Sequence, residues 1–137
     1  MEDREGSFLE IDWHEKPDEE FPGWSHAIRG PWPDFIRTDR VKGITGVEIQ
    51  SPDPAKVAVR WSEIIQEPLT QGPGGPAMQV DNATIRFVEA TDERPEGLGG
   101  IDLAATNAEA AKAAAQSAGL LRDDGVIMIG GMRIRLV

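Results

Sequence analysis

The sequence predicts an α+β fold built from two repeated units of strands and a helix. Residues 44–90 and 98–137 each begin with an alternating strand, continue with a capped helix and end with two short strands. Matching positions in the two first strands, such as Gly46 and Gly100, are 54 residues apart. The last strand of each unit carries an arginine between apolar residues. A pattern that occurs twice defines the organisation of the domain better than a single motif does.

Residues 1–42 differ in composition from the rest, which predicts an N-terminal extension in front of a domain at 43–137. They contain both histidines, three of the four tryptophans and many Asp, Glu and Pro residues. The segment GSFLEIDWHE, residues 6–15, alternates as a strand does. One face of that strand would carry Phe8, Glu10, Asp12 and His14.

The first repeat begins with a predicted strand at ITGVEIQ, residues 44–50. Asp53 is a favoured N-cap residue, and Pro54 suits the first position of a helix. Apolar residues recur at helical spacing through residues 55–66, which predicts an amphipathic helix. Pro68 is expected to end this helix, because the residue before a proline avoids the helical conformation.

Two short strands are expected to complete the first repeat. The segment QGPGGP, residues 71–76, is rich in Gly and Pro and predicts a loop. AMQV at 77–80 and TIRFVEA at 84–90 follow as strands, with Asp81 and Asn82 in a tight connection between them. The charged residues that come next are expected to connect the two repeats.

The second repeat predicts the same order of elements. GGIDLAAT, residues 99–106, is a strand, and Asn107 caps an alanine-rich helix that Gly119 ends. VIMI at 126–129 and MRIRLV at 132–137 are two short strands joined by a glycine turn. The domain is thus expected to be built from two equivalent halves.

Charge and composition exclude several classes of partner and site. The net charge of −10 repels a phosphate backbone, so nucleic acid is not expected as a partner. The chain has no cysteine, which removes disulfides and thiolate metal sites. No apolar run is long enough for a membrane span and no secretory signal is visible, so a cytoplasmic protein is expected. An unpaired strand at a sheet edge favours pairing with another chain, so a homodimer is expected.

Each repeat joins a strand-and-helix segment to a final strand: ITGVEIQSPDPAKVAVRW with ATIRFVEA, and LGGIDLAATNAEAAKAAAQSAG with GGMRIRLV. This pattern resembles the vicinal oxygen chelate superfamily, which includes glyoxalase I, methylmalonyl-CoA epimerase, extradiol dioxygenases and bleomycin-resistance proteins. The unit of that superfamily is a βαβββ module, and two modules pair so that their sheets form a cup. The resemblance implies a glyoxalase-like domain; if it is an enzyme, a lyase, isomerase or dioxygenase is expected.

The resemblance also implies where a metal would be held. In the metal-dependent members, each module offers a His, Gln or Glu early in its first strand and a Glu in its last strand. The first-strand positions fall on Gly46 and Gly100 here, and the last-strand positions fall on Arg86 and Arg135. Glycine has no ligand atom and arginine is a permanent cation, so no metal of the family's kind is expected within 43–137.

Alternation places the candidate binding residues on the sheet face away from the helices. One interpretation is that two structural ion pairs, Glu48–Arg86 and Asp102–Arg135, replace the metal. The other is that the arginines bind the carboxylate or phosphate of an anionic ligand. Three arginines against two carboxylates leave one positive charge, which favours ligand binding. The candidate ligand-binding residues are Glu48, Gln50, Arg86, Asp102, Arg133 and Arg135.

The extension offers an alternative site. Glu10, together with Asp12 and His14, could ligate a divalent metal such as Zn, Mn, Fe or Ni. GSFLEID resembles the last strand of a superfamily module, and Glu10 matches the glutamate that binds the metal there. In this alternative the chain is part of a metal-dependent lyase, isomerase or dioxygenase, whose active site lies in a preceding module or a partner subunit.

A tryptophan-rich segment gives a further alternative. FPGWSHAIRGPWPDF, residues 21–35, contains Trp24 and Trp32 and could be a protein-interaction surface. We favour anion binding at the arginines over both alternatives in the extension. The sequence then predicts a domain that binds a small, anionic organic molecule in its cup, without the family's metal or another cofactor.

Overall fold

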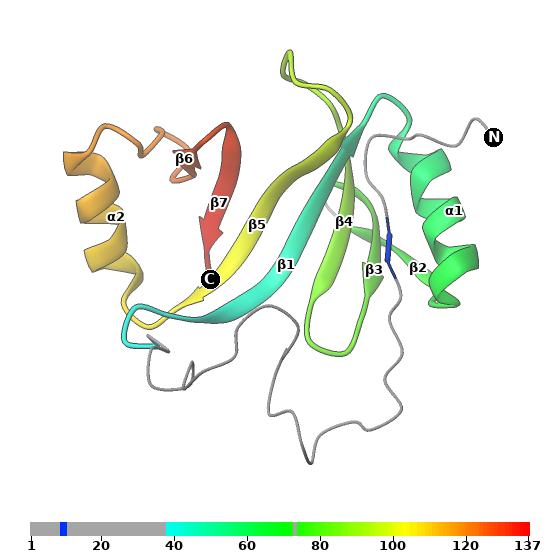
Figure 1. Ribbon diagram of the computed structural model, residues 1–137, viewed down its shortest axis with the longest axis horizontal. Helices are drawn as coiled ribbons and strands as arrows, with labels where there is room; N and C mark the ends of the chain where they lie inside the picture. The colour runs from blue at the N-terminus through cyan, green and yellow to red at the C-terminus, as the bar shows by residue number, and fades with distance from the viewer. Residues whose placement is uncertain (1–8, 11–37, 73) are drawn as a thin grey trace, which may run out of the picture.

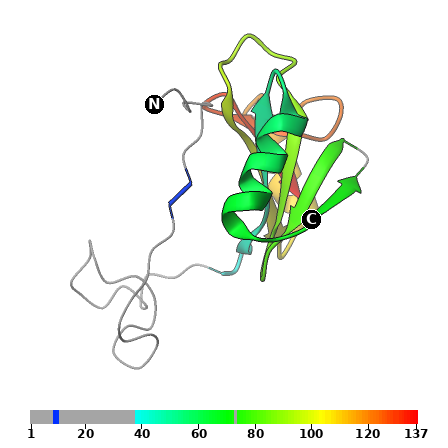
Figure 2. The same ribbon diagram turned by 90° about the vertical axis from the view of Figure 1, so that its right-hand side faces the viewer.

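The computed structural model describes residues 9–10, 38–72 and 74–137. They form one seven-stranded mixed sheet with two helices, and the sheet is open and curled (Figures 1 and 2). The α+β fold predicted from the repeats is confirmed. In chain order the elements are β1 (Val41–Ser51), α1 (Pro54–Ile65), β2 (Leu69–Gly72), β3 (Gly75–Gln79), β4 (Thr84–Glu89), β5 (Gly97–Ala105), α2 (Ala108–Ser117), β6 (Ile127–Ile129) and β7 (Met132–Leu136).

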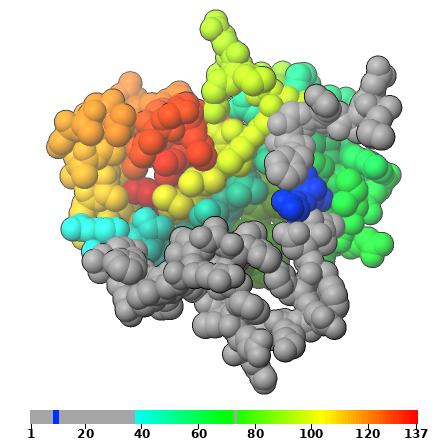
Figure 3. All heavy atoms as spheres, in the orientation of Figure 1, coloured from blue at the N-terminus to red at the C-terminus, as the bar shows by residue number. Residues whose placement is uncertain are grey.

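The first strands of the two repeats, β1 and β5, lie antiparallel at the centre of the sheet. The order across the sheet is β2-β3-β4-β1-β5-β7-β6. β4 runs parallel to β1, and β7 runs parallel to β5, so each repeat places its last strand beside its first. Figure 3 shows the two repeats side by side, the first in cyan and green and the second in yellow to red. The strands β4, β1, β5 and β7 are therefore consecutive neighbours.

Both helices begin at the residues that the sequence predicts. The Asp53 side chain accepts a hydrogen bond from the backbone N–H of Lys56 at 3.1 Å, and the Asn107 side chain accepts one from Ala110 at 2.9 Å. These bonds satisfy N–H groups that have no partner within a helix. α1 ends at Ile65, earlier than predicted, because Gln66 adopts a left-handed conformation with φ of 64°.

The first repeat is a complete βαβββ unit, because the segment predicted as a loop contains the end of β2 and the start of β3. These two strands form an antiparallel hairpin, and β3 pairs in turn with β4. The prediction of a loop was wrong because pairing with a neighbouring strand outweighs a composition rich in Gly and Pro. In the second repeat, a single bridge between Leu121 and Ile127 stands in the place of the β2–β3 pairing.

The hydrophobic core lies between α1 and one face of the sheet. Val57 of α1 is buried with Ile49, Met78 and Phe87 of the strands. Trp61 of α1 meets Phe87 edge to face, with ring centroids 5.6 Å apart and ring planes at 83°. Because successive side chains of a strand point to opposite faces, the residues between these apolar positions face away from α1.

The second repeat is less deeply packed than the first. Ile134 and Leu136 of β7 are half-buried, whereas Ile85 and Phe87, the corresponding residues of β4, are buried. α2 stands at the left of Figure 1, beyond β6, and Ala115 is its buried residue. Within the described ranges, neither helix is long and apolar enough to cross a membrane.

Candidate functional site

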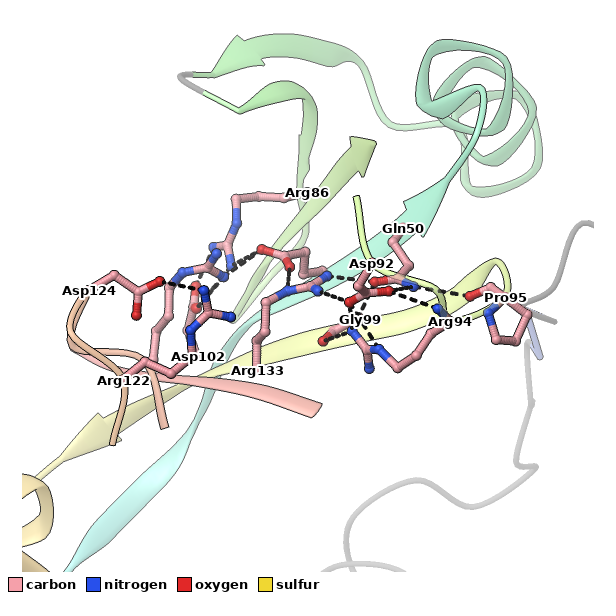
Figure 4. A network of polar contacts seen from close by, with 12 residues as sticks. Gln50, Arg86, Asp92, Arg94, Pro95, Gly99, Asp102, Arg122, Asp124 and Arg133 are labelled. Atoms are coloured by element: carbon pink, nitrogen blue, oxygen red, sulfur yellow. Dashed lines mark hydrogen bonds and ion pairs between the residues drawn. The ribbon is translucent and has the colours of Figure 1, made fainter. Parts of the chain in front are cut away.

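The residues predicted to bind a ligand lie on four consecutive strands. The register places Glu48 of β1 beside Arg86 of β4, and Asp102 of β5 beside Arg135 of β7. These are the neighbours that alternation predicts. Figure 4 shows the side chains of this sheet face joined into a polar network. The predicted residues brought together there are Glu48, Gln50, Arg86, Asp102, Arg133 and Arg135.

Arg86 of the first repeat pairs with Asp102 of the second. Its Nη2 donates to Asp102 Oδ1 at 2.9 Å, and its Nη1 donates to Asp102 Oδ2. Two parallel hydrogen bonds between a guanidinium and a carboxylate are the strong, bidentate form of this contact. The partner of Arg86 therefore lies on β5, beyond the adjacent strand β1.

Glu48 of β1 is held by two arginines of the second repeat. Arg133 Nε donates to Glu48 Oε1 at 2.6 Å, and Arg135 Nη1 donates to Glu48 Oε2 at 2.5 Å. The Glu48 side chain is only 2% exposed. A carboxylate is tolerated at such depth when it is paired and hydrogen-bonded. In the described part of the chain, no buried side-chain nitrogen or oxygen lacks a partner.

The two predicted ion pairs, Glu48–Arg86 and Asp102–Arg135, are present, but they are the longer contacts of the network. Glu48 and Arg86 approach only to 3.7 Å, and Asp102 and Arg135 only to 4.0 Å. The shorter bonds join the two repeats to each other. An arginine side chain is long enough to pass over one strand, and the pairing of β1 with β5 brings a better-placed carboxylate within its reach.

Two glycines leave room for the arginine side chains that pass over a neighbouring strand. A Cβ atom at Gly46 of β1 would collide with Asp102 Oδ2 and would lie 3.3 Å from Arg86 Nη1. A Cβ atom at Gly99 of β5 would collide with Arg133 Nη2. Each glycine lies in the path of an arginine that reaches over its strand. The absence of a side chain at these positions is thus a requirement of the network.

The connector between the repeats also enters the network, which the sequence analysis did not predict. Asp92 Oδ2 accepts from Arg133 Nη1 at 2.7 Å and from Arg94 Nη2 at 2.8 Å. Gln50 donates to Asp92 Oδ1 at 3.1 Å and accepts from Arg94 at 3.0 Å. The sequence contained only a weak signal for these contacts, which is an arginine among acidic residues in the connector. This connector joins β4 to β5, the strands on either side of β1.

Ionisation follows from these contacts. Burial acts to raise the pKa of Glu48, but hydrogen bonds from Arg133 and Arg135 outweigh it, so this pKa lies below its usual value. The hydrogen bond to Asp102 raises the pKa of Arg86. Hydrogen bonds from Arg94 lower the pKa of Asp92 well below its usual range. Glu48, Asp92 and Arg86 are therefore held in their charged forms at neutral pH.

The cations of the network are more exposed than the two central carboxylates. The side chain of Asp102 is 10% exposed, against 26% for Arg86 and 38% for Arg135. The guanidinium groups therefore form the solvent-facing layer of the network, and the buried carboxylates lie beneath them. We call this set the arginine cluster; it consists of Arg86, Arg94, Arg133 and Arg135 with Glu48, Asp92 and Asp102.

The donor set does not fit the metal that the resemblance implies. Gly46 lies against the network as predicted, and Arg86 and Arg135 occupy the last-strand positions. In the second repeat, a Cβ atom at Gly99 would meet the guanidinium of Arg133, and one at Gly100 would meet its backbone oxygen and Cβ. None of these residues offers a metal ligand. Across residues 9–10, 38–72 and 74–137, no group of three or more His, Asp or Glu residues is placed to hold a metal ion.

The alternatives in the extension fall largely outside the described residues. Glu10 is exposed, whereas Asp12 and His14, its proposed partners, lie outside the described ranges. The tryptophan-rich segment at 21–35 lies outside them as well. A separate pocket precedes β6 and is lined by Arg122, Asp123 and Asp124.

Comparisons with solved structures support the fold. The chain resembles the crystal structure of methylmalonyl-CoA epimerase from Mycobacterium tuberculosis, with a TM-score of 0.54 and 15% identity over 74% of this chain and 91% of that one. It also resembles a hypothetical protein from Staphylococcus aureus, with a TM-score of 0.51 and 12% identity. That match covers 77% of this chain but only 36% of the other.

No protein-family model matches the chain, and its sequence matches no curated protein. At the identities of the structural matches, the likeness concerns the fold and not the activity. Methylmalonyl-CoA epimerase is a member of the vicinal oxygen chelate fold that the repeat resembles. The chain accordingly shares the fold of methylmalonyl-CoA epimerase, with two paired modules in one sheet.

Proposed function

We propose that this domain binds a small, anionic organic molecule at the arginine cluster, without the metal of its fold family. The observation that supports this most is an excess of positive charge. Four arginines of the cluster face three carboxylates, although the chain as a whole carries a net charge of −10. A local positive site on an acidic protein attracts and orients anions while the rest of the surface repels them.

The position of the cluster supports the same proposal. Arg86 of β4 and Arg135 of β7 stand where the fold family is expected to carry metal-binding glutamates, on the strands that flank β1 and β5. A metal in that place would attract negatively charged groups, and a guanidinium can do so as well. Structural ion pairs alone would need only as many arginines as carboxylates. The additional arginine is explained by a negative charge that the ligand supplies.

Thermal unfolding with and without small acids tests this proposal. At constant ionic strength, we expect at least one of acetate, butanoate, succinate and inorganic phosphate to raise the Tm of the protein, because a ligand of the folded state stabilises it. The double variant Arg86→Gln/Arg135→Gln is expected to lose this effect. Arg60→Gln removes an exposed arginine of α1 that pairs with Glu63, and serves as the matched control that keeps it.

Three outcomes would overturn all or part of the proposal. If no small acid stabilises the protein, or if the double variant responds as the parent does, the cluster is a structural ion-pair network. If elemental analysis after exposure to Zn, Mn, Fe and Ni finds a stoichiometric metal, the metal-free part is wrong. The alternative at Glu10 then becomes the stronger one, because its partners would come from residues beyond the described ranges.

The remaining expectations concern partners and location. A homodimer and a cytoplasmic location stay proposals, and sedimentation of the purified chain tests the first of them. Nucleic acid remains an unfavoured partner, because one excess charge in the cluster is small beside the acidity of the whole chain.

A further inference from the structure

The arginines of the cluster are not equivalent in how many of their donors are already used. Arg133 engages all three nitrogens: Nε donates to Glu48 at 2.6 Å, Nη1 to Asp92 at 2.7 Å and Nη2 to Gln50 at 2.7 Å. Its side chain is only 14% exposed. Arg133 therefore has little capacity left for a ligand, and its contacts tie the second repeat to β1 and to the connector.

Arg135, in contrast, uses only one of its three guanidinium nitrogens in contacts with the described residues. Its Nη1 makes both of its contacts, with Glu48 at 2.5 Å and Asp102 at 4.0 Å. Its Nε and Nη2 have no partner among the described residues. At 38%, its side chain is the most exposed of the four arginines. A half-exposed arginine is thus anchored at one nitrogen and open at the other two.

The two open nitrogens form a ready-made anion site. The N–H bonds of Nε and Nη2 point in the same direction along one edge of the planar guanidinium. That edge matches the two oxygens of a carboxylate, which accept one hydrogen bond each. Glu48 holds the opposite side of the guanidinium, so the edge is positioned before a ligand arrives. Such preorganisation lowers the entropy cost of binding.

We propose that Arg135 is the ligand-binding arginine of the cluster, and that its Nε–H and Nη2–H hold the carboxylate of a singly charged organic acid. Arg133 is a positioning residue, because it acts through Glu48 and the connector. This inference rests on the proposed function and names the residue and the ligand class within it.

The charge balance of the arginine cluster favours the binding of a monocarboxylate over that of a phosphate dianion. The cluster has one positive charge in excess, which one carboxylate neutralises. A second negative charge at the same place would be repelled by Asp102 and Glu48, which lie beneath Arg135 and are shielded from water. The carboxylate is also planar, as the open edge of the guanidinium is, whereas a phosphate is tetrahedral.

Side-chain NMR tests this assignment directly. The Nε–H group of each arginine gives its own signal in a ¹H–¹⁵N spectrum, and Arg→Lys variants identify which signal belongs to which residue. We expect acetate and butanoate to shift the Arg135 signal in a saturable way. Inorganic phosphate should bind at least about tenfold more weakly at equal ionic strength and at a pH where it is a dianion.

Two lysine variants separate the roles of Arg135 and Arg133. Lysine keeps the positive charge but lacks the two parallel N–H donors of the guanidinium. Arg135→Lys should weaken acetate binding by about tenfold or more, because a bidentate charged contact becomes a single one, with little loss of stability. Arg133→Lys should lower Tm more than Arg135→Lys does and weaken binding less. If Arg133→Lys does not fold, Arg94→Lys takes its place, since Arg94 also bonds to Asp92 and Gln50.

The outcomes distinguish this inference from the proposed function. Saturable binding that leaves the Arg135 signal unmoved, or that prefers phosphate, overturns the inference while the cluster remains an anion site. Equal losses of affinity in the two lysine variants overturn the distinction between Arg135 and Arg133. An absence of binding by every acid overturns the proposed function, and the inference with it.

Discussion

Arg86 and Asp102 form a bidentate ion pair across β1, a strand to which neither belongs. The pair exists because Gly46 lies beneath it and has no side chain to block it. On the other side, Arg133 reaches from β7 over Gly99 of β5 to Glu48. The two repeats are therefore joined by ion pairs as well as by the backbone pairing of β1 with β5.

Adding one methyl group at Gly46 should disrupt this junction. In Gly46→Ala, the new Cβ would collide with Asp102 and displace Arg86, so a half-buried ion pair would be broken. We expect the free energy of unfolding to fall by about 2–4 kcal/mol, as for other buried pairs that lose their geometry. Denaturant unfolding measures the change.

The matched control is Gly43→Ala in the same strand. A Cβ atom there has no neighbour within 4 Å. The change should leave stability unaltered or raise it by up to about 1 kcal/mol, because alanine loses less conformational freedom than glycine on folding. Equal effects at the two glycines would show that strand propensity, and not the ion pair, explains the result.

Acid should destabilise the protein through Glu48. The pKa of Glu48 in the folded protein lies below the value of 4.5 for the unfolded chain. Its contribution to stability is thus complete above about pH 4.5 and is lost as the pH falls through the folded-state pKa. Denaturant unfolding measured over a series of acidic pH values follows the loss.

Glu48→Gln should remove part of that pH dependence. At neutral pH the variant should be less stable by about 2–3 kcal/mol, because Arg133 and Arg135 lose their charged partner but keep some contact with water. The slope of stability against pH between neutrality and the acid limit should become shallower. A variant with the slope of the parent would assign the acid sensitivity to other carboxylates.

The connector should loosen when Asp92 loses its charge. In Asp92→Asn, an amide donor replaces either Oδ2, which accepts from the Arg94 and Arg133 side chains, or Oδ1, which accepts from Gln50 and the Arg94 backbone N–H. We expect faster amide hydrogen exchange in residues 91–96. The neighbouring Glu93→Gln is the control, because the Glu93 side chain makes no hydrogen bond or ion pair with the described residues. Unchanged exchange in Asp92→Asn would mean that the contacts of Gln50 with Pro95 and Arg94 hold the connector by themselves.

The two helix caps should contribute similar amounts to the free energy of unfolding. Asp53→Ala and Asn107→Ala each remove a side chain that accepts an N–H bond in the first turn, so each should cost about 1 kcal/mol in the free energy of unfolding. Asp81→Ala changes an exposed residue of the β3–β4 loop and should stay within about 0.5 kcal/mol of the parent. If Asn107→Ala left the free energy of unfolding unchanged, α2 could fray without unfolding the sheet.

Local features of the sequence accounted for the elements and for the faces of their residues. The caps at Asp53 and Asn107 and the offset between the repeats predicted both helices and the order of strands. Alternation placed Glu48 and Arg86 on one face, because side chains of a strand alternate whatever the strand pairs with. The hairpin of β2 with β3 was missed, since its stability comes from the neighbouring strand and not from its own composition.

The partners within the candidate site were decided only by the tertiary structure. The sequence by itself determined that arginines and carboxylates share one face of the sheet. The antiparallel pairing of β1 with β5 then set which charges meet, by placing Asp102 within reach of Arg86 and Glu48 within reach of Arg133. Ion-pair energy depends on distances of a few ångströms between residues far apart in the chain, and only the packed sheet sets those distances.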